Sequence, residues 1–428
     1  MKVALINPHW RYEGSIYFGC RAPHLPLELG IAQQKLREAG HKTLLIDAHM
    51  FALSLSDVVG EVRAFAPDVA VVTTAPTYLF WRCAPPELRV PRELIDHLRD
   101  LVPFTAAIGP HGSTTPRAAL RKLGVDLVVM GECETTLLHV ANGTWPDCPG
   151  TCYVEGDRII VNGGPQAATF TDQPALDWPD EMIRLHDHHH HRFEAEPIGP
   201  GAEVEASRGC PYNCTFCAKE NFRNGYRKRP PDVVLDEVMR LQKQGVEYVY
   251  FIDEIFLPNE ALLRGLVGRG LKFGVQTRID LWKPEMLKLL GEAGCVSVEA
   301  GVESLTPEGR AALAKRCKMT TEQLADRLIA AKQHIPFVQA NLIEVPQDDD
   351  AEVQRWRARM NDAGVWANDP VPLYPYPGSP DYTKLWGAPD DEAWERAHRH
   401  YLGLFDAFSD VQEQRPLPLP ELERRMAS

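Results

Sequence analysis

Two successive series of short apolar runs, each alternating with helix-like stretches, constrain the fold of this chain more than any other feature. In the first series, the runs are nearly continuous in apolar residues, which is typical of strands buried on both faces of a sheet. Strands that alternate with helices favour a parallel sheet. We expect such strands at residues 2–7, 42–49, 68–76, 104–111 and 125–132.

The second series begins near residue 202 and contains six further strand–helix repeats. This number of repeats is typical of a partial (β/α)6 barrel resembling a TIM barrel, in which the chemistry takes place at the carboxyl ends of the strands. The expected strands are 202–209, 246–254, 272–280, 295–303, 336–345 and 365–374.

The two series together predict an α/β protein with four parts. Residues 1–145 are expected to form a doubly wound, Rossmann-like parallel sheet, which binds ligands beyond the carboxyl ends of its strands. Residues 146–200 are rich in Pro, Asp and His, which indicates an irregular connecting segment. The partial barrel is expected over 201–388, and a short helical tail over 389–428.

The composition of the chain limits the classes of binding partner and the cellular compartment that we expect. The 428 residues carry a formal net charge of −13, which argues against a nucleic-acid or anionic-membrane partner because no basic excess can neutralise phosphates. No apolar run reaches the roughly 18 residues of a transmembrane helix, and the first residues lack the pattern of a signal peptide. We therefore expect a cytoplasmic protein, in which the ten cysteines are thiols or metal ligands.

Cys210, Cys214 and Cys217 follow the pattern C-x3-C-x2-C in the loop after the first strand of the second series. Thiolates at such spacing are typical ligands of zinc or of iron–sulfur clusters. A structural zinc site needs a fourth ligand, and Cys295 and Cys317 are far along the chain. A further alternative is that the three cysteines are small core residues that bind no metal. On a 4Fe–4S cube, three cysteines would leave one iron without a protein ligand.

The cysteine segment resembles the cluster motif of the radical S-adenosylmethionine (SAM) superfamily. In that motif the residue before the last cysteine is usually aromatic, and Phe216 occupies this position. The resemblance implies that Cys210, Cys214 and Cys217 hold a 4Fe–4S cluster and that SAM binds its open iron. It also implies reductive cleavage of SAM to a 5′-deoxyadenosyl radical, with the reactive chemistry supplied by the cofactors.

Three later segments resemble the same family's SAM-contacting strands. "FIDEIF" (251–256) implies that Asp253 or Glu254 contacts the ammonium group of SAM. "QTRID" (276–280) implies that Arg278 points into the barrel, and "EAGVES" (299–304) implies that Glu303 faces SAM. Taken singly, each acidic residue is better interpreted as a solvated or ion-paired strand end, but their order and placement together favour contacts with SAM.

The first series resembles the cobalamin-binding domain of the cobalamin-dependent radical SAM enzymes, on the segments 23–41, 109–116 and 125–134. The likeness implies that loops 73–78 and 109–116 surround the corrin and its nucleotide tail, and that His111 contacts this tail or a backbone carbonyl and not the metal. The chain has no D-x-H-x-x-G motif, which leaves cobalt's lower face without that histidine. The implied cofactor-binding residues are Thr73, Thr74, Gly109, Pro110, His111, Gly131 and Glu132.

Four consecutive histidines, His188 to His191, suggest a metal site at first sight. In an extended segment alternate side chains point to opposite sides, so the four rings cannot all face one ion. We expect packing between domains, with a substrate or cobalamin contact as the second interpretation and a dedicated metal site as the third.

These resemblances predict an enzyme that uses a 4Fe–4S cluster, SAM and cobalamin to methylate an unactivated carbon of a small molecule. A radical rearrangement or cyclisation is the alternative reaction, and a metal-stabilised module that senses cobalamin is the alternative class. Reduction of the cluster would require an external donor, a flavodoxin or a ferredoxin. The sequence names neither the substrate nor the residues that act on it.

Overall fold

The computed structural model describes the chain except for residues 17–21, 78–83, 187–199, 220–222, 405–414 and 425–428. The chain divides into two compact units. Unit 1 comprises residues 1–169, 218–224 and 374–428, and unit 2 comprises residues 170–217 and 225–373. The histidine run at 188–191 lies outside the described residues.

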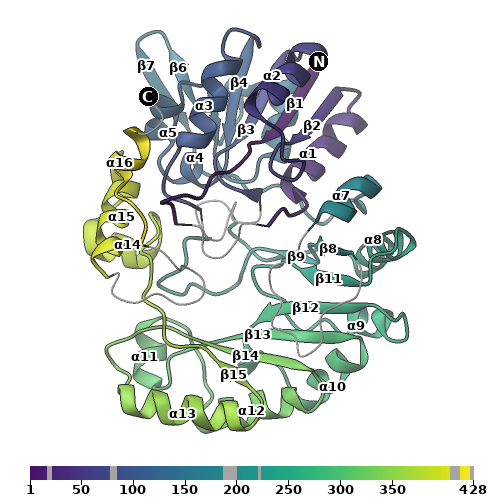
Figure 1. Cartoon of the computed structure of the whole chain (residues 1–428), viewed down its shortest axis with the longest axis vertical. Helices are drawn as coiled ribbons and strands as arrows, with labels where there is room; N and C mark the ends of the chain where they lie inside the picture. The colour runs from purple at the N-terminus through teal and green to yellow at the C-terminus, as the bar shows by residue number, and fades with distance from the viewer. Residues whose placement is uncertain (17–21, 78–83, 187–199, 220–222, 405–414, 425–428) are drawn as a thin grey trace. The chain divides into compact units, whose positions relative to one another are not determined.

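Unit 1 contains a seven-stranded sheet in the order β2-β1-β3-β4-β5-β6-β7 (Figure 1). The five expected strands are confirmed and are all parallel. The order β2-β1-β3 reverses direction at β1, which makes the crevice beyond β1 and β3 the topological switch point of the sheet. The parallel strands are β1 (Lys2–Asn7), β2 (Lys42–Asp47), β3 (Val69–Thr73), β4 (Phe104–Ile108) and β5 (Leu127–Val129).

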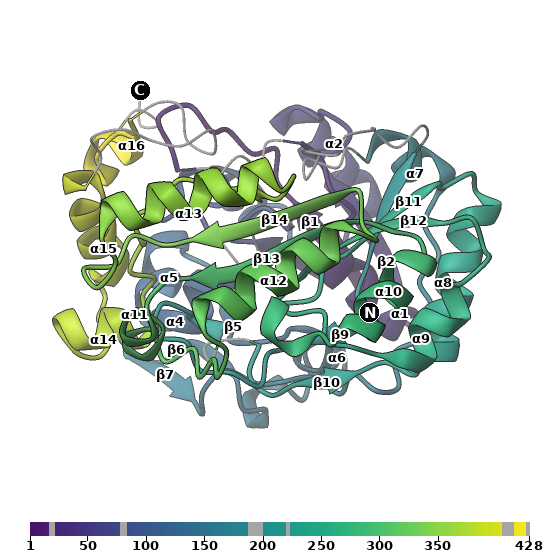
Figure 2. The same cartoon turned by 90° about the horizontal axis from the view of Figure 1, so that it is seen from below.

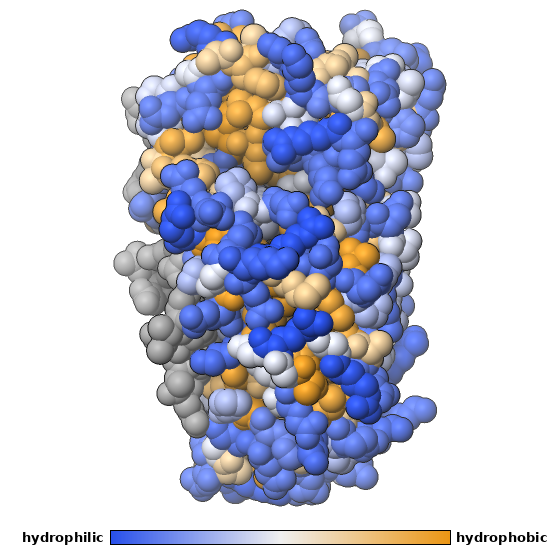
Figure 3. Space-filling model, turned by 90° about the vertical axis from the view of Figure 1, so that its right-hand side faces the viewer, coloured by the Kyte–Doolittle hydropathy of each residue, from blue (hydrophilic) through white to orange (hydrophobic). Residues whose placement is uncertain are grey.

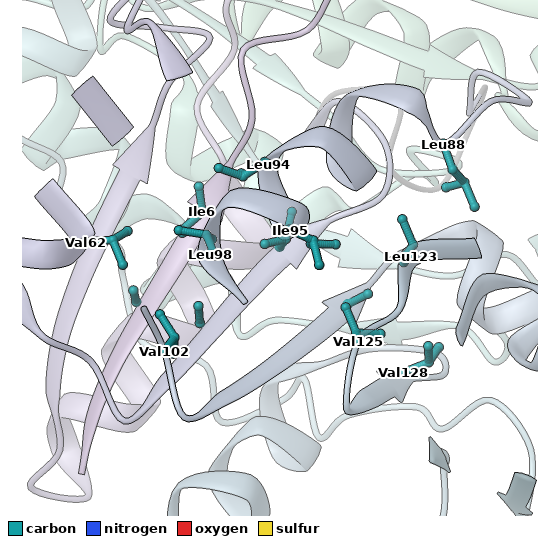
Figure 4. Packing of buried hydrophobic residues seen from close by; sticks show 14 of the residues in the cluster. Ile6, Val62, Leu88, Leu94, Ile95, Leu98, Val102, Leu123, Val125 and Val128 are labelled. Carbon is teal, nitrogen blue, oxygen red and sulfur yellow. The ribbon is translucent and has the colours of Figure 1, made fainter. Parts of the chain in front are cut away.

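Helices cover both faces of this sheet, as the apolar strands require. On one face α2, α3 and α5 bury a continuous apolar cluster that includes Ile6, Val62, Leu98 and Val128 (Figure 4). On the other face α1 and α6 pack together. The helix bounds are α1 (Leu27–Glu38), α2 (Leu55–Phe65), α3 (Arg89–Leu98), α4 (Pro110–Thr114), α5 (Pro116–Leu123) and α6 (Glu134–Ala141).

Local sequence signals begin and end these helices. Ser54 and Asp57 form a capping box at the start of α2, which satisfies backbone N–H groups that the first turn leaves unpaired. Helix α5 starts at Pro116 and stops at Gly124, whose φ of +63° is the left-handed conformation that glycine adopts without strain.

The segment 146–200, expected to be irregular, contains a hairpin instead. Strands β6 (Thr151–Glu155) and β7 (Arg158–Asn162) pair with each other and extend the sheet antiparallel to β5. The signal was present in the sequence, because Gly156 and Asp157 form a two-residue turn between two runs of strand-forming residues. Helix α7 (Asp180–Leu185) follows and belongs to unit 2.

Strand β2 is the edge of the unit 1 sheet opposite to the hairpin. Its side chains at Thr43, Leu44 and Leu45 are only half-buried, in contrast to the fully buried pattern of β3. Figure 3 shows an apolar area in the upper part of an otherwise largely hydrophilic surface.

Unit 2 contains a six-stranded parallel sheet in the order β15-β14-β13-β12-β11-β8, so all six expected strands are confirmed in sequence order. Figure 2 shows α12 and α13 lying over β13 and β14. The strands are β8 (Gly201–Val204), β11 (Tyr248–Phe251), β12 (Lys272–Thr277), β13 (Cys295–Glu303), β14 (Phe337–Leu342) and β15 (Trp366–Ala367). The helices are α8 (Pro231–Lys243), α9 (Glu260–Leu266), α10 (Pro284–Glu292), α11 (Pro307–Ala312), α12 (Thr321–Lys332) and α13 (Asp350–Asp362).

The two faces of the unit 2 sheet differ in chemistry. Successive residues of a strand point to opposite faces. One face is formed by fully buried apolar residues such as Phe251, Val275, Val298 and Val338. The opposite face carries polar side chains, namely Glu203, Tyr248, Tyr250, Gln276, Ser297, Glu299, Gln339 and Asn341.

The C-terminal segment belongs to unit 1 from Tyr374 onward, which places the end of the barrel earlier than the expected residue 388. The reason is packing: Tyr374, Tyr382 and Tyr401 form a buried aromatic cluster with Ile16 of the N-terminal region. The helices of this segment are α14 (Pro380–Trp386), α15 (Ala393–Gly403) and α16 (Leu419–Arg424). Among the described residues, no helix is long and apolar enough to span a membrane.

Candidate active site

The three cysteines of the motif lie on a loop that the fold holds at several points. Strand β8 leads into the two-residue strand β9 (Ser207–Arg208), and Gly209 then turns the chain with a φ of +79°. Within the loop, the amide of Cys217 donates to the carbonyl of Cys214 at 3.1 Å. All three cysteines are partly exposed, so the loop presents three accessible thiols from one short stretch of backbone.

Asp253 and Glu254, which follow β11, hold the start of this loop. The carboxylate of Asp253 accepts hydrogen bonds from the Ala206 amide at 2.8 Å and from the Ser207 hydroxyl at 2.5 Å. Glu254 accepts a hydrogen bond from the Gly209 amide at 2.7 Å. Burial raises the pKa of Asp253 to about 7, against the lowering effect of the Ser207 hydrogen bonds. The predicted SAM-contacting acids therefore brace the cysteine loop.

Arg278, at the end of β12, lies against the motif itself. Its guanidinium forms an ion pair with Asp280 at 2.8 Å, and both side chains are buried. The same guanidinium lies 4.2 Å from the centroid of the Tyr212 ring, and Tyr212 stands between Cys210 and Cys214. This cation–π contact joins the third strand to the cysteine loop.

Glu303, at the end of β13, has the strained conformation often found at functional sites. Its φ of +68° is unusual for a residue with a side chain. Its carboxylate forms a 2.7 Å ion pair with Lys315, whose side chain is only 2% exposed. A Cβ at Gly301 would lie 2.3 Å from Oε1 of Glu303, so a larger residue there would displace this carboxylate from its present position.

The Glu303–Lys315 pair lies beside the cluster motif. Burial raises the pKa of the Cys214 thiol, while Lys315 and then Arg278 lower it and Glu303 raises it. A thiolate at Cys214 would therefore face two cations. Lys315 could not be predicted from the sequence, because a lysine in a stretch with several charged residues is usually a solvated side chain.

A fourth cysteine folds back toward this region. The carbonyl of Leu313 accepts a hydrogen bond from the Thr215 amide at 3.1 Å, so the segment that follows α11 borders the cysteine loop. Cys317 of this segment interacts electrostatically with Asp280 and Arg278. In the described part of the chain, no group of three Cys, His, Asp or Glu side chains is placed to bind a single ion.

The donor set of the loop fits an iron–sulfur cluster. The loop presents three accessible thiols, which are soft ligands, and Lys315 and Arg278 favour the thiolate form of Cys214 against the larger opposing effect of burial. Phe216, the aromatic residue of the motif, is half-buried between Thr215 and Cys217. Glu303 and Arg278 are brought to Cys214, whereas Asp253 and Glu254 are engaged with the backbone before Cys210.

In unit 1, the residues predicted to contact cobalamin do lie at the carboxyl ends of neighbouring strands. Thr73 ends β3, and its hydroxyl donates to the buried Asn7 side chain at 3.3 Å. The next residue, Thr74, hydrogen-bonds through its amide to the carbonyl of Ile108, the last residue of β4. Both threonine side chains are buried, so they stabilise the strand ends from within.

His111 is buried and turned into unit 1. Its Nδ1 lies 3.3 Å from the Thr74 hydroxyl, and its ring stacks on Trp394 of α15 with 4.4 Å between centroids. Burial, and then Lys122, lower the pKa of His111 to about 3, so the ring is neutral. The preceding residues Gly109 and Pro110 form the turn into α4, where Gly109 has a φ of +130°.

Gly131 and Glu132 also serve the packing of unit 1. A Cβ at Gly131 would lie 2.2 Å from the carbonyl oxygen of Gln166, so only glycine allows this close approach. The Glu132 carboxylate accepts a hydrogen bond from the Ala168 amide at 3.1 Å. The side chains of the predicted cobalamin loops are thus used internally, which leaves the loop backbone as the surface for a ligand.

Comparison with known proteins agrees with this geometry. Residues 204–358, which contain the cysteine loop and the strands around it, match the family model of the radical SAM superfamily. The chain is 27% identical over 329 residues to the anaerobic magnesium-protoporphyrin IX monomethyl ester cyclase of Cereibacter sphaeroides, covering 71% of this chain and 50% of that protein. It is 26% identical over 417 residues to the hopanoid C-3 methylase of Methylococcus capsulatus, covering 92% and 74%.

The fold extends the likeness to both units. The radical SAM methyltransferase TsrM from Kitasatospora setae, solved with cobalamin and a [4Fe-4S] cluster, superimposes with a TM-score of 0.68 at 19% identity. The match covers 89% of this chain and 76% of that chain. Residues 204–358 are therefore a radical SAM domain, and the chain has the fold of TsrM, which is solved with cobalamin.

Proposed function

We propose that this enzyme methylates a carbon atom of a small molecule with SAM as the methyl source. The observation that carries the proposal is the loop of Cys210, Cys214 and Cys217, braced by Asp253 and Glu254 and bordered by the Glu303–Lys315 pair. When bound, a 4Fe–4S cluster, SAM and cobalamin would supply reductive cleavage and methyl transfer.

In this proposal the residues of unit 2 bind and orient SAM. Glu303 presents a carboxylate next to Cys214, where it can accept hydrogen bonds from an ammonium or from ribose hydroxyls. Lys315 holds that carboxylate in place from a buried position. The ion pair between Arg278 and Asp280 fixes the other side of the loop through Tyr212.

The polar face of the unit 2 sheet favours a polar substrate. Its side chains include the carboxylates Glu203 and Glu299 and the amides Gln276, Gln339 and Asn341. Substrates with hydroxyl, amide or amino groups would find hydrogen-bond partners there, whereas a pure hydrocarbon has no group that could bond to these side chains.

The role of cobalamin rests on the fold and not on individual side chains. TsrM is solved with cobalamin, and unit 1 has the same doubly wound architecture. We propose that the backbone of the loops after β3, β4 and β5, including Gly109 and Gly131, contacts the cofactor. The buried side chains of Thr73, Thr74 and His111 would keep these loops rigid.

The proposal can be tested before the substrate is known. The chain would be reconstituted anaerobically with iron, sulfide and cobalamin and given SAM labelled in its methyl group. We expect a cluster whose EPR spectrum changes when SAM binds, transfer of label to cobalamin, and release of S-adenosylhomocysteine. A cluster that does not respond to SAM, or label that stays in SAM, would contradict the proposal.

Ring formation is the second candidate, because one of the relatives is a cyclase. The two reactions differ in their products. Methylation consumes SAM as a methyl donor and releases S-adenosylhomocysteine, whereas a cyclisation that uses only the radical releases 5′-deoxyadenosine alone. Measuring both nucleosides in one reaction therefore separates the candidates. The cluster would need electrons from an external donor in either case.

A further inference from the structure

Two short segments of unusual charge lie beside the cysteine loop. The chain as a whole has 59 acidic and 46 basic residues, which gives the net charge of −13. Residues 223–229 nevertheless contain four basic residues and no acidic one, and residues 310–318 do the same. Such clusters within an acidic chain call for a local explanation.

Half of these basic residues have internal partners. Lys315 pairs with Glu303, and Arg310 donates hydrogen bonds to the carbonyls of Ser304 and Met319. In the other segment, two buried arginines form ion pairs. These pairs are Arg223 with Glu28 and Arg229 with Glu237.

The other half lies at the surface and forms what we call the basic rim, defined as Arg227, Lys228, Arg316 and Lys318. Lys228, Arg316 and Lys318 are exposed, and Arg227 is half-buried and donates a hydrogen bond to the Gly225 carbonyl. Within the described part of the chain, no carboxylate pairs with Lys228, Arg316 or Lys318.

The basic rim borders the cysteine loop from two directions within unit 2. Strand β10 (Arg227–Lys228) pairs antiparallel with β9, which directly precedes Gly209. On the other border, the segment with Arg316 and Lys318 follows Leu313, which hydrogen-bonds to Thr215. Between the borders, Pro211 and Asn213 of the loop are exposed.

We propose that the basic rim is the docking surface for the acidic electron-carrier protein that reduces the cluster. This inference rests on the proposed function, because only an enzyme with a redox cluster needs such a partner. An acidic carrier would be repelled by the net charge of the chain at long range, so a local cationic surface is needed to orient it. The rim provides this surface around the loop that presents the thiols.

The test replaces one lysine from each border of the rim with glutamate. K228E/K318E changes the charge by four units without touching a cysteine or the Glu303–Lys315 pair. The matched control, K243E/K272E, makes the same change at the C-terminus of α8 and the start of β12, the opposite end of the strands. Both variants and the parent enzyme would be reconstituted with cluster and reduced anaerobically, either by reduced flavodoxin or by dithionite.

We expect K228E/K318E to slow cluster reduction by flavodoxin about tenfold or more at low salt, since charge steering changes association rates by about 10- to 1,000-fold. The difference should shrink at high salt because the interaction is screened. Dithionite should reduce all three proteins equally, and K243E/K272E should follow the parent enzyme. The conservative variant K228R/K318R should retain the parent rate.

Other outcomes would overturn the inference in recognisable ways. Equal flavodoxin rates for K228E/K318E and the parent enzyme would show that the rim does not dock the donor. An equal loss with dithionite would show that the lysines act on the cluster or the fold. If the parent enzyme formed a cluster that dithionite reduced without SAM cleavage, the proposed function would fail while the docking measurement could still be made.

Discussion

At the scale of single residues, the exposure of each cysteine separates the thiols of the motif from a thiol of the core. Cys210, Cys214 and Cys217 are partly exposed thiols, whereas Cys295 is fully buried in β13, where its Sγ–H points to the Ser297 carbonyl. The contrast separates ligand cysteines from core cysteines, since only accessible thiols near cations form reactive thiolates.

Replacing Cys214 by alanine should abolish assembly of the cluster. Two thiolates from the same loop cannot hold a cube that needs three protein ligands, so iron and sulfide content should fall to background after anaerobic reconstitution. C295A is the control, because it removes a core thiol and should keep the parent iron content. Retention of a full cluster by C214A would show that this thiol is not a ligand.

Glu303→Gln should weaken SAM binding while leaving the cluster intact. The change breaks a buried ion pair with Lys315 and removes a charged acceptor, and a charge-assisted hydrogen bond contributes about 1.5–3 kcal/mol. We expect the Kd for SAM, measured by EPR titration, to rise by about one to two orders of magnitude. Glu285→Gln, at an exposed position, is the control and should leave the Kd for SAM unchanged. An unchanged Kd for Glu303→Gln would show that Glu303 does not face SAM.

At the scale of elements, both units position their sites at the ends of parallel strands. In unit 1, the ends of β1, β2 and β3 are joined by a buried network in which the Asn7 amide donates to Asp47 at 2.9 Å and Trp10 donates to Asn7 at 2.8 Å. In unit 2, Asp253 and Glu254 after β11 brace the cysteine loop, and Glu303 at the end of β13 lies beside it. Strand ends thus serve as rigid platforms for loops.

The Asp47 network predicts a pH-dependent stability of unit 1. Burial raises the pKa of Asp47 to about 6, against hydrogen bonds from Met50 and Asn7 that lower it. The folded state therefore binds the proton more tightly than the unfolded state. Protonated Asp47 therefore contributes about 3 kcal/mol to the free energy of unfolding. This contribution is fully present below about pH 4 and is lost as the pH rises through 6.

Asp47→Asn should remove this dependence. Urea unfolding at pH 5 and pH 8 should then give the variant a smaller difference in the free energy of unfolding than the parent enzyme. If the variant and the parent enzyme showed the same pH dependence, a titratable group other than Asp47 would be responsible for it. Asp68→Asn, at the exposed opposite end of the strands, is the matched control.

The buried ion pair between Arg223 and Glu28 joins Arg223, which lies shortly after the last cysteine in the sequence, to α1 within unit 1. Glu28→Gln should destabilise unit 1 by up to about 3–5 kcal/mol, because it removes a counter-charge from a buried arginine. Chemical denaturation would measure the loss. Asp96→Asn, which breaks an exposed pair with Arg99, should cost less than about 1 kcal/mol.

At the scale of the whole molecule, the C-terminal segment is an integral part of unit 1. Trp394 of α15 packs against Ala75 and Ala84 and stacks on His111, and ion pairs join Arg121 to Asp391 and Lys122 to Glu395. Farther on, the Leu417 amide donates to the Gly14 carbonyl at 2.7 Å. Helices α14 and α15 therefore cover apolar side chains from the N-terminal part of unit 1 that water would otherwise reach.

A chain that ends at Leu373 should consequently fold poorly. It would expose Ile16, Ala75 and Ala84 to water and lose the buried aromatic cluster of Tyr374, Tyr382 and Tyr401. We expect a lower thermal midpoint and increased binding of a hydrophobic dye relative to the full chain. An unchanged midpoint would show that the segment contributes no stability to unit 1.

Much of the fold could be predicted from local pattern. Eleven parallel strands were expected at the positions where the structure has them, because buried strands and amphipathic helices leave strong periodic signals. The hairpin at 151–162 was missed, since the Pro, Asp and His residues of the segment 146–200 suggested an irregular connection. The motif Cys210–Cys217 was also predictable, because its three cysteines are neighbours in the sequence.

Tertiary structure alone decided what surrounds that motif. Lys315 pairs with Glu303 and approaches Cys214, and Arg278 stacks on Tyr212, across separations that no local pattern encodes. The inward turn of His111 depends on Trp394, which lies far away in the sequence. Spacing and periodicity are properties of adjacent residues, whereas burial, ion pairing and pKa depend on which distant segments the fold brings into contact.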